Sequence, residues 1–583
     1  METAHNFLQR VLTHAISSAF TELSSTETLA DVTQCEQEQF GHYQCNSALR
    51  LARLLKLPPR AVAQKIIDAI GLEDKKTFSN ISIAGPGFVN FTFAAEALSK
   101  QLQTMLLDEF LGAAIPKKRE KIIVEFSSPN VAKELHVGHI RSTIIGDCLA
   151  RLFEFLGQDV LRLNHIGDWG TQFGMLIAYM KIHASDVLNG AIATDPQQLL
   201  IWYKAAKKTF DADPDFKKTA QSEVVALQSG KPQSLHAWKM ICDISRTGFQ
   251  EIYQLLNVHI EERGESFYNP QLKSIVDELD QKGLVTISEG AKCVFLDGFK
   301  NREGEPLPLM IQKSDGGYNY DTTDMAALKY RIFTDRADRI VIVTDVGQSL
   351  HFQMIFAAGE KAGWLDLKRT RVDHVGFGLV LGTDGKKFKT RSGETEKLID
   401  LLTEAVDQAR NMIVERMPEA SRHEIDHLAK VIGIGAVKYS DLSSHRTKDY
   451  TFSYERMLRF EGNTAVFLLY AYVRINGIKR KVGADIAELM RSEVMCLAHP
   501  SEISLGVHLR RFGEVLQSVA EDLLPNRLAE YLYHLAEKFN AFFRDCRVEG
   551  SAEENSRLIL CELTAKVLKK GLNILGLETV DRM

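Results

Sequence analysis

The sequence predicts a multidomain α/β protein. In it, a Rossmann-type parallel-sheet domain with a helical insertion stands between an α+β N-terminal domain and an all-α C-terminal bundle. The chain has 583 residues, a length typical of about three or four domains. An apolar run over 121–126, an amphipathic helix from about 136 and a second apolar run over 160–163 form the βαβ pattern of a nucleotide-binding sheet. From about residue 450 the pattern is helical throughout.

The composition is that of an ordinary globular protein, with 45% hydrophobic and 25% charged residues. A net charge of −5 excludes a general nucleic-acid coat, although local basic patches can still bind nucleic acid. Eight scattered cysteines without a CxxC pair offer no zinc ribbon or disulfide framework. The stretch from Met1 to Phe20 is amphipathic and lacks the apolar h-region of a signal peptide, and no apolar run reaches membrane-spanning length. We therefore expect a cytoplasmic protein with no membrane partner.

Three domains are predicted along the chain. Residues 1–115 read as an α+β domain, because helical stripes precede a strand–turn–strand pattern over 81–93. Residues 116–450 carry the parallel sheet, with insertions at about 184–290 where the pattern turns helical and charged. An ordinary run of surface helices is equally compatible with that segment. Residues 451–583 are predicted to form the helix bundle.

A phosphate-binding turn is predicted where the first strand of the sheet passes into its helix. The polar turn Ser128-Pro129-Asn130 follows the strand, and His136-Val137-Gly138-His139 enters the helix. A helix N-terminus presents unpaired N–H groups and the positive end of the helix dipole, and both favour phosphate. Gly138 allows a ligand to approach the backbone closely.

The two histidines admit three interpretations. His136 and His139 could hold a metal ion, although no third ligand stands at a recognised spacing. They could also be core or capping histidines. Together with Lys133 in the preceding loop, they could cradle the phosphates of ATP and stabilise the charge that builds during displacement at the α-phosphorus. We favour this third interpretation.

Three later segments of the sheet domain carry further candidate residues. Tyr320 and Asp324 are four residues apart, so on a helical turn they face the same way. Gln348 follows a buried strand over 339–343 and enters another helix. After the turn at 382–385, four cations crowd one loop: Lys386, Lys387, Lys389 and Arg391. A solvated charge run is the alternative for that loop.

The histidine motif resembles the His-Ile-Gly-His signature of class I aminoacyl-tRNA synthetases. Longer strings are similar to arginyl-tRNA synthetases in particular, and the resemblance covers nearly the whole chain. These strings are Glu125-Phe126-Ser127-Ser128-Pro129-Asn130, Arg141-Ser142-Thr143, Asn164-His165-Ile166-Gly167-Asp168-Trp169-Gly170, Phe388-Lys389-Thr390-Arg391, Asp441-Leu442-Ser443, Arg446-Thr447-Lys448-Asp449-Tyr450 and Phe460-Glu461-Gly462-Asn463-Thr464-Ala465.

The resemblance implies roles for individual residues. Glu125 and Asn130 would hold the α-amino end of arginine, and Tyr320 with Asp324 would receive the guanidinium group. A guanidinium ion offers five donors in a planar fork, so an opposed carboxylate with polar neighbours is the expected receptor. The remaining implied arginine contacts are Ser128, Pro129, His139 and Gln348. The implied ATP contacts are His136, Gly138, His139 and Lys389, and the implied catalytic residues are His136, His139, Lys133, Lys387 and Lys389.

The basic loop departs from the class I pattern, which reads Lys-Met-Ser-Lys-Ser. Aligned on Lys387, the second lysine of the pattern is replaced by Thr390; aligned on Lys386, Lys389 fills that place. The sequence leaves the two registers open. Arginyl enzymes often lack the second lysine and are thought to compensate with a lysine just upstream of the histidine signature, which here is Lys133.

The resemblance implies an arginine–tRNA ligase. Such an enzyme activates L-arginine with ATP to arginyl-adenylate and then transfers the arginyl group to the 3′-terminal ribose of tRNA(Arg). Magnesium would arrive with ATP, and we expect no protein-bound metal and a monomeric chain. The helical domain would recognise the anticodon, with Tyr472, Arg474 and residues 479–481 as candidates. The alternatives are another nucleotidyl-transfer enzyme on the same sheet, such as a pantothenate-type ligase or a cysteinyl enzyme, and a non-catalytic tRNA-binding relative.

Overall fold

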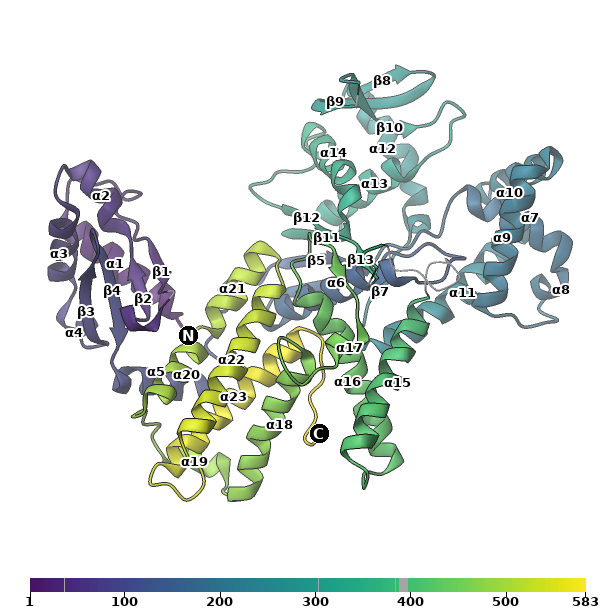
Figure 1. The fold of residues 1–583 in the computed structure, drawn as a ribbon. Helices are drawn as coiled ribbons and strands as arrows, with labels where there is room; N and C mark the ends of the chain where they lie inside the picture. Colours follow the sequence, from purple (N-terminus) through teal and green to yellow (C-terminus); the bar gives the residue numbers. More distant parts are fainter. Residues whose placement is uncertain (36, 302, 383, 387–396) are drawn as a thin grey trace. The chain divides into compact units, whose positions relative to one another are not determined.

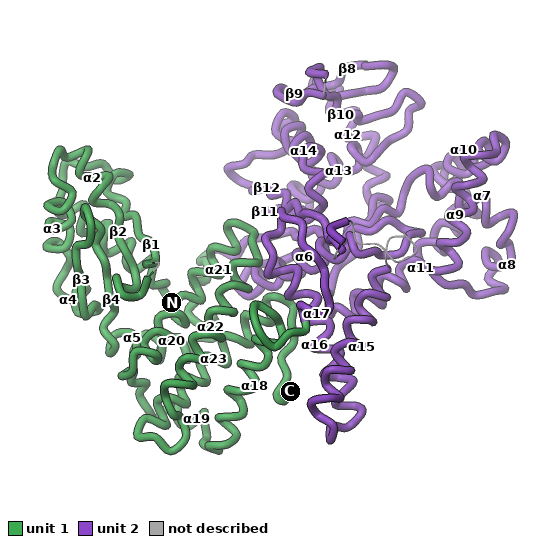
Figure 2. The backbone as a smooth tube through the Cα atoms, in the orientation of Figure 1, with its two compact units in different colours: residues 1–117, 458–583 green, residues 118–457 purple. Residues whose placement is uncertain are grey.

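The computed structural model describes all residues of the chain except 36, 302, 383 and 387–396 (Figure 1). The chain divides into two compact units, coloured separately in Figure 2. Residues 1–117 and 458–583 form the first unit, and residues 118–457 form the second. The two ends of the chain therefore belong to one unit, which the sequence pattern had not indicated.

The N-terminal part of the first unit is built on a four-stranded antiparallel sheet in the order β1-β2-β4-β3. Helix α1 packs beside α3 through a buried stripe in which Leu8, Leu12 and Ile16 recur every four residues. The strands are β1 (Val32–Gln34), β2 (Tyr43–Cys45), β3 (Phe78–Ala84) and β4 (Phe88–Phe93). The helices are α1 (Ala4–Ala19), η1 (Glu38–Phe40), α2 (Ser47–Leu55), α3 (Pro59–Ala69), α4 (Leu72–Lys75) and α5 (Ala95–Leu107).

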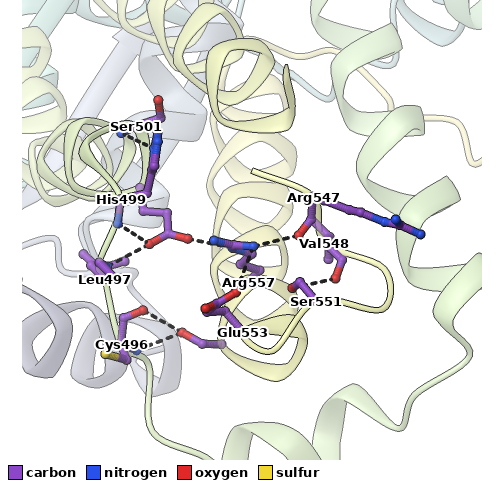
Figure 3. Close-up of polar contacts among 12 residues, drawn as sticks. Cys496, Leu497, His499, Ser501, Arg547, Val548, Ser551, Glu553 and Arg557 are labelled. Atoms are coloured by element: carbon purple, nitrogen blue, oxygen red, sulfur yellow. Dashed lines mark hydrogen bonds and ion pairs between the residues drawn. The ribbon is translucent and has the colours of Figure 1, made fainter. Parts of the chain in front are cut away.

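The C-terminal part of the first unit is helical. Its helices are α18 (Ala465–Val482), α19 (Ile486–Ser492), α20 (Pro500–Arg510), α21 (Phe512–Asp522), α22 (Asn526–Asp545) and α23 (Glu554–Ile574). A buried ion pair joins two of them, because Arg557 of α23 donates to Glu502 of α20 at 2.7 Å (Figure 3). The same carboxylate accepts the backbone N–H groups of Ala498 and His499, and so fixes the start of α20.

Polar contacts fasten the two parts of the first unit together. Glu514 of α21 accepts the Tyr43 hydroxyl at 2.7 Å and the backbone N–H of His5 at 2.8 Å. Helix α5 packs against α20, and Ser99 of α5 accepts the N–H of Leu497 at 3.2 Å. The sheet and the helices of this unit therefore share an interface.

The second unit contains the predicted parallel sheet, in the order β12-β11-β5-β6-β7 (Figure 1). Its strands are β5 (Lys121–Glu125), β6 (Asp159–Asn164), β7 (Glu261–Glu262), β11 (Arg339–Asp345) and β12 (Arg371–Phe377), and all pairs are parallel. Helix α6 (Val137–Phe155) approaches the end of β5 closely, since a Cβ atom at Gly146 would lie 2.2 Å from Phe126, the residue after that strand. The carboxyl ends of these strands, where ligands of such sheets bind, lie along one edge.

Helices fill much of the interval between β6 and β7. They are α7 (Thr171–His183), α8 (Ser185–Leu188), α9 (Pro196–Ala212), α10 (Pro214–Gln228) and α11 (Pro232–Leu255). Asp195 and Asp213 are the N-cap residues of α9 and α10, and proline is the first residue of each helix. Both features favour the start of a helix at these positions.

A small antiparallel sheet in the order β10-β9-β8 interrupts the second half of the unit, and the sequence pattern did not predict it. The parallel sheet resumes only at β11. This region contains η2 (Glu265–Tyr268), α12 (Asn269–Gln281), β8 (Val285–Ser288), β9 (Ala291–Lys300), β10 (Pro306–Gln312), α13 (Tyr320–Phe333), η3 (Val346–Gln348) and α14 (Ser349–Lys361). The unit ends with β13 (Val380–Leu381), α15 (Leu398–Arg416), α16 (Arg422–Leu442), β14 (Tyr450–Thr451) and α17 (Tyr454–Met457).

The predicted fold class is confirmed: an α+β N-terminal part, a parallel-sheet core with a helical insertion, and a helical C-terminal part. Within the described residues, no helix combines the length and the apolar character that crossing a membrane requires.

Candidate active site

The loop that follows β5 has an unusual backbone. Ser127, Ser128 and Ala132 all have positive φ angles, of 70°, 47° and 62°. Residues other than glycine rarely adopt this left-handed conformation, and such strain is maintained only where the surroundings enforce it. The backbone of this loop is therefore strained, and the strain lowers its local stability.

A buried hydrogen-bond network enforces the conformation. The N–H of Ser127 donates to Ser142 of α6 at 2.9 Å, and the N–H of Ser128 donates to Asn164 of β6 at 2.9 Å. The hydroxyls of Ser127 and Tyr253 lie 2.7 Å apart, and Asn164 donates to Tyr253 at 3.1 Å. Two segments of the core, α6 and β6, and one helix of the insertion, α11, thus hold the loop.

The turns after β5 and β6 meet each other directly. The N–H of Gly167 donates to Pro129 O at 3.0 Å, and the N–H of Val131 donates to Gly167 O at 3.1 Å. A Cβ atom at Gly167 would lie 2.2 Å from the side-chain oxygen of Asn130, so a larger residue there would require the Asn130 side chain to move. The turns after β5 and β6 are therefore parts of one site.

His136 and His139 cap the helix that they begin. Nδ1 of His136 accepts the N–H of Gly138 at 3.0 Å, and Nδ1 of His139 accepts the N–H of His136 at 3.1 Å. Burial lowers the pKa of His139 to about 3, and His136 contributes to that shift. Because a neutral imidazole whose Nδ1 accepts carries its proton on Nε2, the capping arrangement makes each Nε2 a hydrogen-bond donor.

The second cluster of candidate residues lies at the start of α13. The helix begins at Tyr320, so Tyr320 and Asp324 lie in its first turns. Nε2 of His351, in the first turn of α14, is 2.6 Å from Asp324, and Nε2 of His165 is 3.7 Å from it. Tyr320 is 61% exposed, so the open side of this cluster can admit a ligand.

Glu125, at the end of β5, lies buried against the same helix. Its carboxylate pairs with Arg331 of α13 at 2.6 Å. Arg331 is seven residues beyond Asp324, which places both on one side of α13. The end of β5 and the Asp324 cluster are therefore joined through one face of this helix.

Glu265 is a further acidic residue of this region, and the sequence reasoning missed it. Burial raises the pKa of Glu265 to about 8, and the negative charges of Asp324 and Asp168 add to that rise. The next residue, Ser266, donates both its N–H and its hydroxyl to Asp168, at 2.8 and 2.6 Å. Glu265 is thus held beside the turn after β6, with its charge suppressed by the neighbouring carboxylates.

The remaining predicted residues lie around these two clusters. Gln348 is the last residue of η3 and is exposed. Lys133 is exposed and lies 5.9 Å from the ring of Tyr203 in α9. A cavity of about 310 Å³ separates the Lys133 loop from the first turn of α9 and the face of α11.

Lys387 and Lys389 lie outside the described residues. The chain just beyond them returns to the histidine signature, since Lys397 pairs with His136 in a β-bridge. The ammonium group of Lys397 also lies 2.9 Å from the Glu134 carboxylate.

Comparison with known proteins decides the family of this chain. The model of the class I (R) tRNA synthetase catalytic domain matches residues 101–454, the arginyl tRNA synthetase N-terminal domain matches 6–93, and the DALR anticodon binding domain matches 468–583. The arginine–tRNA ligase of Protochlamydia amoebophila (strain UWE25) is 60% identical over 585 residues, which cover 100% of both chains. The chain belongs to the arginyl-tRNA synthetase family.

Other members of the arginyl-tRNA synthetase family agree with this assignment. The arginine–tRNA ligase of Chlamydia felis (strain Fe/C-56) is 52% identical over 581 residues and 100% of both chains. The crystal structure of arginyl-tRNA synthetase from Plasmodium falciparum has a TM-score of 0.88 and 33% identity, with 100% of both chains covered. The Thermus thermophilus arginyl-tRNA synthetase, at 24% identity and a TM-score of 0.80 over 99% of this chain and 100% of the other, supports the fold alone.

The structure brings together several of the strings that resemble arginyl-tRNA synthetases. Arg141 of α6 is fully buried and donates to Asp441 of α16 at 3.1 Å and to the carbonyl of Lys448 at 3.0 Å. Its guanidinium also lies 5.1 Å from the ring of Tyr450. The motifs that contain Arg141, Asp441 and Tyr450 are distant in the sequence but form one buried cluster.

Proposed function

We propose how the residues of this site divide the work of the family's reaction, the ATP-dependent joining of arginine to tRNA. The reaction itself follows from family membership over the full length of the chain. The observation that supports the division most strongly is that α13, which carries Asp324, pairs through Arg331 with Glu125 at the end of β5, while Ser142 in the second turn of α6 accepts the N–H of Ser127 in the loop that follows. A cationic amino acid and a phosphate group would thereby be held next to each other.

Asp324 is the counter-charge for the guanidinium group in this proposal. A partly exposed carboxylate with Tyr320 in the preceding turn can accept a planar fork of N–H donors, and Gln348 offers a further polar contact. Glu265, whose pKa is raised by burial and by Asp324, would ionise as the guanidinium approaches. An uncharged analogue would leave the net negative charge of this cluster unmatched and be rejected strongly.

The α-amino end of arginine would lie at the turn after β5. Glu125 and Asn130 are its proposed ligands, with Ser128, Pro129 and His139 lining the same turn. Glu125 is already paired with Arg331 at 2.6 Å, so the α-amino group would share that carboxylate with an internal cation. This pairing gives the buried Glu125 carboxylate a counter-charge when arginine is absent.

ATP would be bound at the start of α6. The helix N-terminus, Gly138 and the Nε2–H donors of His136 and His139 form the proposed phosphate site. Lys133, Lys387 and Lys389 would supply the remaining positive charge. Magnesium would accompany ATP and be held mainly by the phosphates. Arginine's carboxylate would then attack the α-phosphorus with no covalent enzyme intermediate.

The first unit would carry the tRNA contacts, with the helical part reading the anticodon. Of the candidate residues there, Tyr472 is buried and Lys479 pairs with Glu562, whereas Arg474 lies over the rings of Tyr470 and Phe543. Those two rings are 38% and 43% exposed and could stack on unpaired bases. We further propose that the protein acts on tRNA(Arg) as a cytoplasmic monomer.

ATP–pyrophosphate exchange tests the proposed function. The exchange is measured with and without tRNA, for arginine and for a set of other amino acids. Arginine-dependent exchange that is strengthened by tRNA supports the proposal. Exchange with another amino acid but not with arginine would overturn it.

A further inference from the structure

His351 lies at the centre of the Asp324 cluster but belongs to none of the proposed ligand sets. It stands in the first turn of α14, and its side chain is 18% exposed. Its Nε2 is 2.6 Å from Asp324 and its Nδ1 is 3.3 Å from Asp321. Its ring also makes an edge-to-face contact with the ring of Tyr320, with centroids 5.2 Å apart. One imidazole therefore touches both residues proposed to receive the guanidinium group.

We propose that His351 is a positioning residue for arginine: it clamps Asp321 and Asp324 and supports Tyr320, and so holds the guanidinium receptor in place before arginine arrives. This inference rests on the proposed role of Asp324 and adds a residue that acts through it. His351 itself contacts no reacting atom in the proposal, because the chemistry takes place at the other end of arginine.

The chemistry of the contacts supports the clamp. Ionised carboxylates only accept hydrogen bonds, so a ring whose two nitrogens both face carboxylates must donate from both and is an imidazolium ion. Burial alone would lower the pKa of His351, but its hydrogen bonds to Asp321 and Asp324 outweigh burial and raise the pKa to about 9. The ring is therefore charged at neutral pH, in agreement with the geometry.

The negative charges of Asp321 and Asp324 explain why a positively charged residue is needed between them. Asp321 and Asp324 lie three residues apart on α13, so two like charges face each other across one helical turn. Glu265 and Arg331 also interact with Asp324, and His165 faces its other oxygen. His374 of β12 lies close enough to interact with His351. The imidazolium offsets one of the two aspartates. One net negative charge then remains at this point of α13 to match the single charge of a guanidinium group.

The His351→Ala variant tests the inference through steady-state exchange kinetics at pH 7.5, with tRNA present. The KM for arginine should rise about tenfold or more, the typical effect of losing hydrogen bonds to a charged group. The kcat and the KM for ATP should stay within about twofold, because the clamp acts only on the side-chain receptor. Added imidazole should restore the low KM at pH 7, and this rescue should weaken at pH 9, where free imidazole is neutral.

Two controls separate the failure of this inference from the failure of the proposed arginine site. Asp324→Asn should raise the KM for arginine by itself, and adding His351→Ala to it should change the KM by less than about twofold, because the two act as a unit. If Asp324→Asn leaves the KM unchanged, the proposed site is wrong. If Asp324→Asn raises the KM but His351→Ala does not, only the clamp is wrong.

A matched variant controls for general damage to the fold. His374→Gln alters a histidine that lies beside Thr344, at 2.8 Å, and stacks on Phe352, and it should leave the KM for arginine within about twofold. Thermal melting shows whether each variant is folded. If His351→Ala melts below the assay temperature, His351→Gln takes its place with the same expected rise in KM. A fall of kcat with no change in KM would overturn the inference for either variant.

Discussion

The possible roles of His136 and His139 depend on which ring nitrogen of each already forms a hydrogen bond. The Nδ1 atoms of His136 and His139 accept backbone N–H groups at 3.0 and 3.1 Å, which leaves the proton of each neutral ring on Nε2. The capping interpretation of these histidines and the ATP interpretation are therefore compatible, since each ring can cap the helix through one nitrogen and donate to phosphate through the other.

His136→Asn separates the two roles. Asparagine is a good N-cap residue and places an acceptor near the position of Nδ1, so the melting temperature should change little. It lacks the Nε2–H donor, so arginine activation should slow by about a hundredfold or more, as when one oxyanion donor is lost. Thermal melting and single-turnover adenylate formation measure the two effects. A large loss of stability with a nearly normal rate would show that His136 only caps the helix.

The raised pKa of Glu265 predicts a proton release on arginine binding. In the ligand-free protein its pKa is about 8, so the side chain is mostly protonated at pH 7. A guanidinium ion beside it would lower that pKa, so up to about one proton per arginine should leave at pH 7 and almost none above pH 9. Calorimetry in two buffers of different ionisation enthalpy counts these protons.

Glu265→Gln is the control for this proton count, since it removes the titrating group and keeps the side-chain size. The variant should bind arginine without proton release at pH 7. Equal release from the variant and the unmodified protein would contradict the role of Glu265.

The limits of sequence reasoning are clear for these residues. Tyr320 and Asp324 could be paired because they are four residues apart on one helix. Glu265 and His351 reach the same cluster from η2 and α14, and no spacing in the sequence predicts such a meeting. The left-handed backbone of Ser127 and Ser128 was equally unpredictable, because serine does not favour that conformation and only the surrounding hydrogen bonds enforce it.

At the scale of elements, the prediction succeeded where one local signal dominates. The apolar run of β5, the amphipathic α6 and the strand–turn–strand pattern of β3 and β4 were all read correctly. The sheet of β8, β9 and β10 was missed, and β10 contains Pro306 and Pro308, which argue against a strand in a sequence pattern. Helix α13 begins at Tyr320, so Tyr320 and Asp324 do lie on one helix.

Helices α20 and α23 depend on a buried ion pair, which gives a stability prediction. Arg557→Met would leave the Glu502 carboxylate, only 1% exposed, without its cation, and should lower the free energy of unfolding by about 3 kcal/mol at pH 7. Chemical unfolding of this variant measures the loss. Adding Glu502→Gln should recover part of it, because the buried charge is then removed as well.

The pH dependence of the same pair has a defined sign. Burial raises the pKa of Glu502, but the N–H of His499 and the Arg557 cation outweigh it and hold the pKa below its ordinary value. The stabilisation is therefore present above about pH 4.5 and is lost as the pH falls through the folded-state pKa. The difference between Arg557→Met and the unmodified protein should shrink in acid. A difference that stays constant down to pH 3 would contradict this account.

At the scale of the whole molecule, the sequence predicted three successive segments, whereas the structure has two compact units and joins both ends of the chain in one of them. Contacts such as Tyr43–Glu514 link residues 471 positions apart, and no local pattern reveals them. Deleting residues 1–115 would therefore remove the partners of α20 and α21 as well as a part that we propose contacts tRNA. Substitutions on the surface of that part are the cleaner way to test its role.

The central claim is that the second unit holds the two ends of arginine and the phosphates of ATP around the turn after β5. A crystal structure with arginine and a non-hydrolysable ATP analogue tests it most directly. We predict guanidinium nitrogens within about 3 Å of the Asp324 carboxylate, the α-amino group at Glu125 and Asn130, and the α-phosphate at the start of α6. A guanidinium group bound at another carboxylate, or an α-phosphate remote from His136 and His139, would contradict the account.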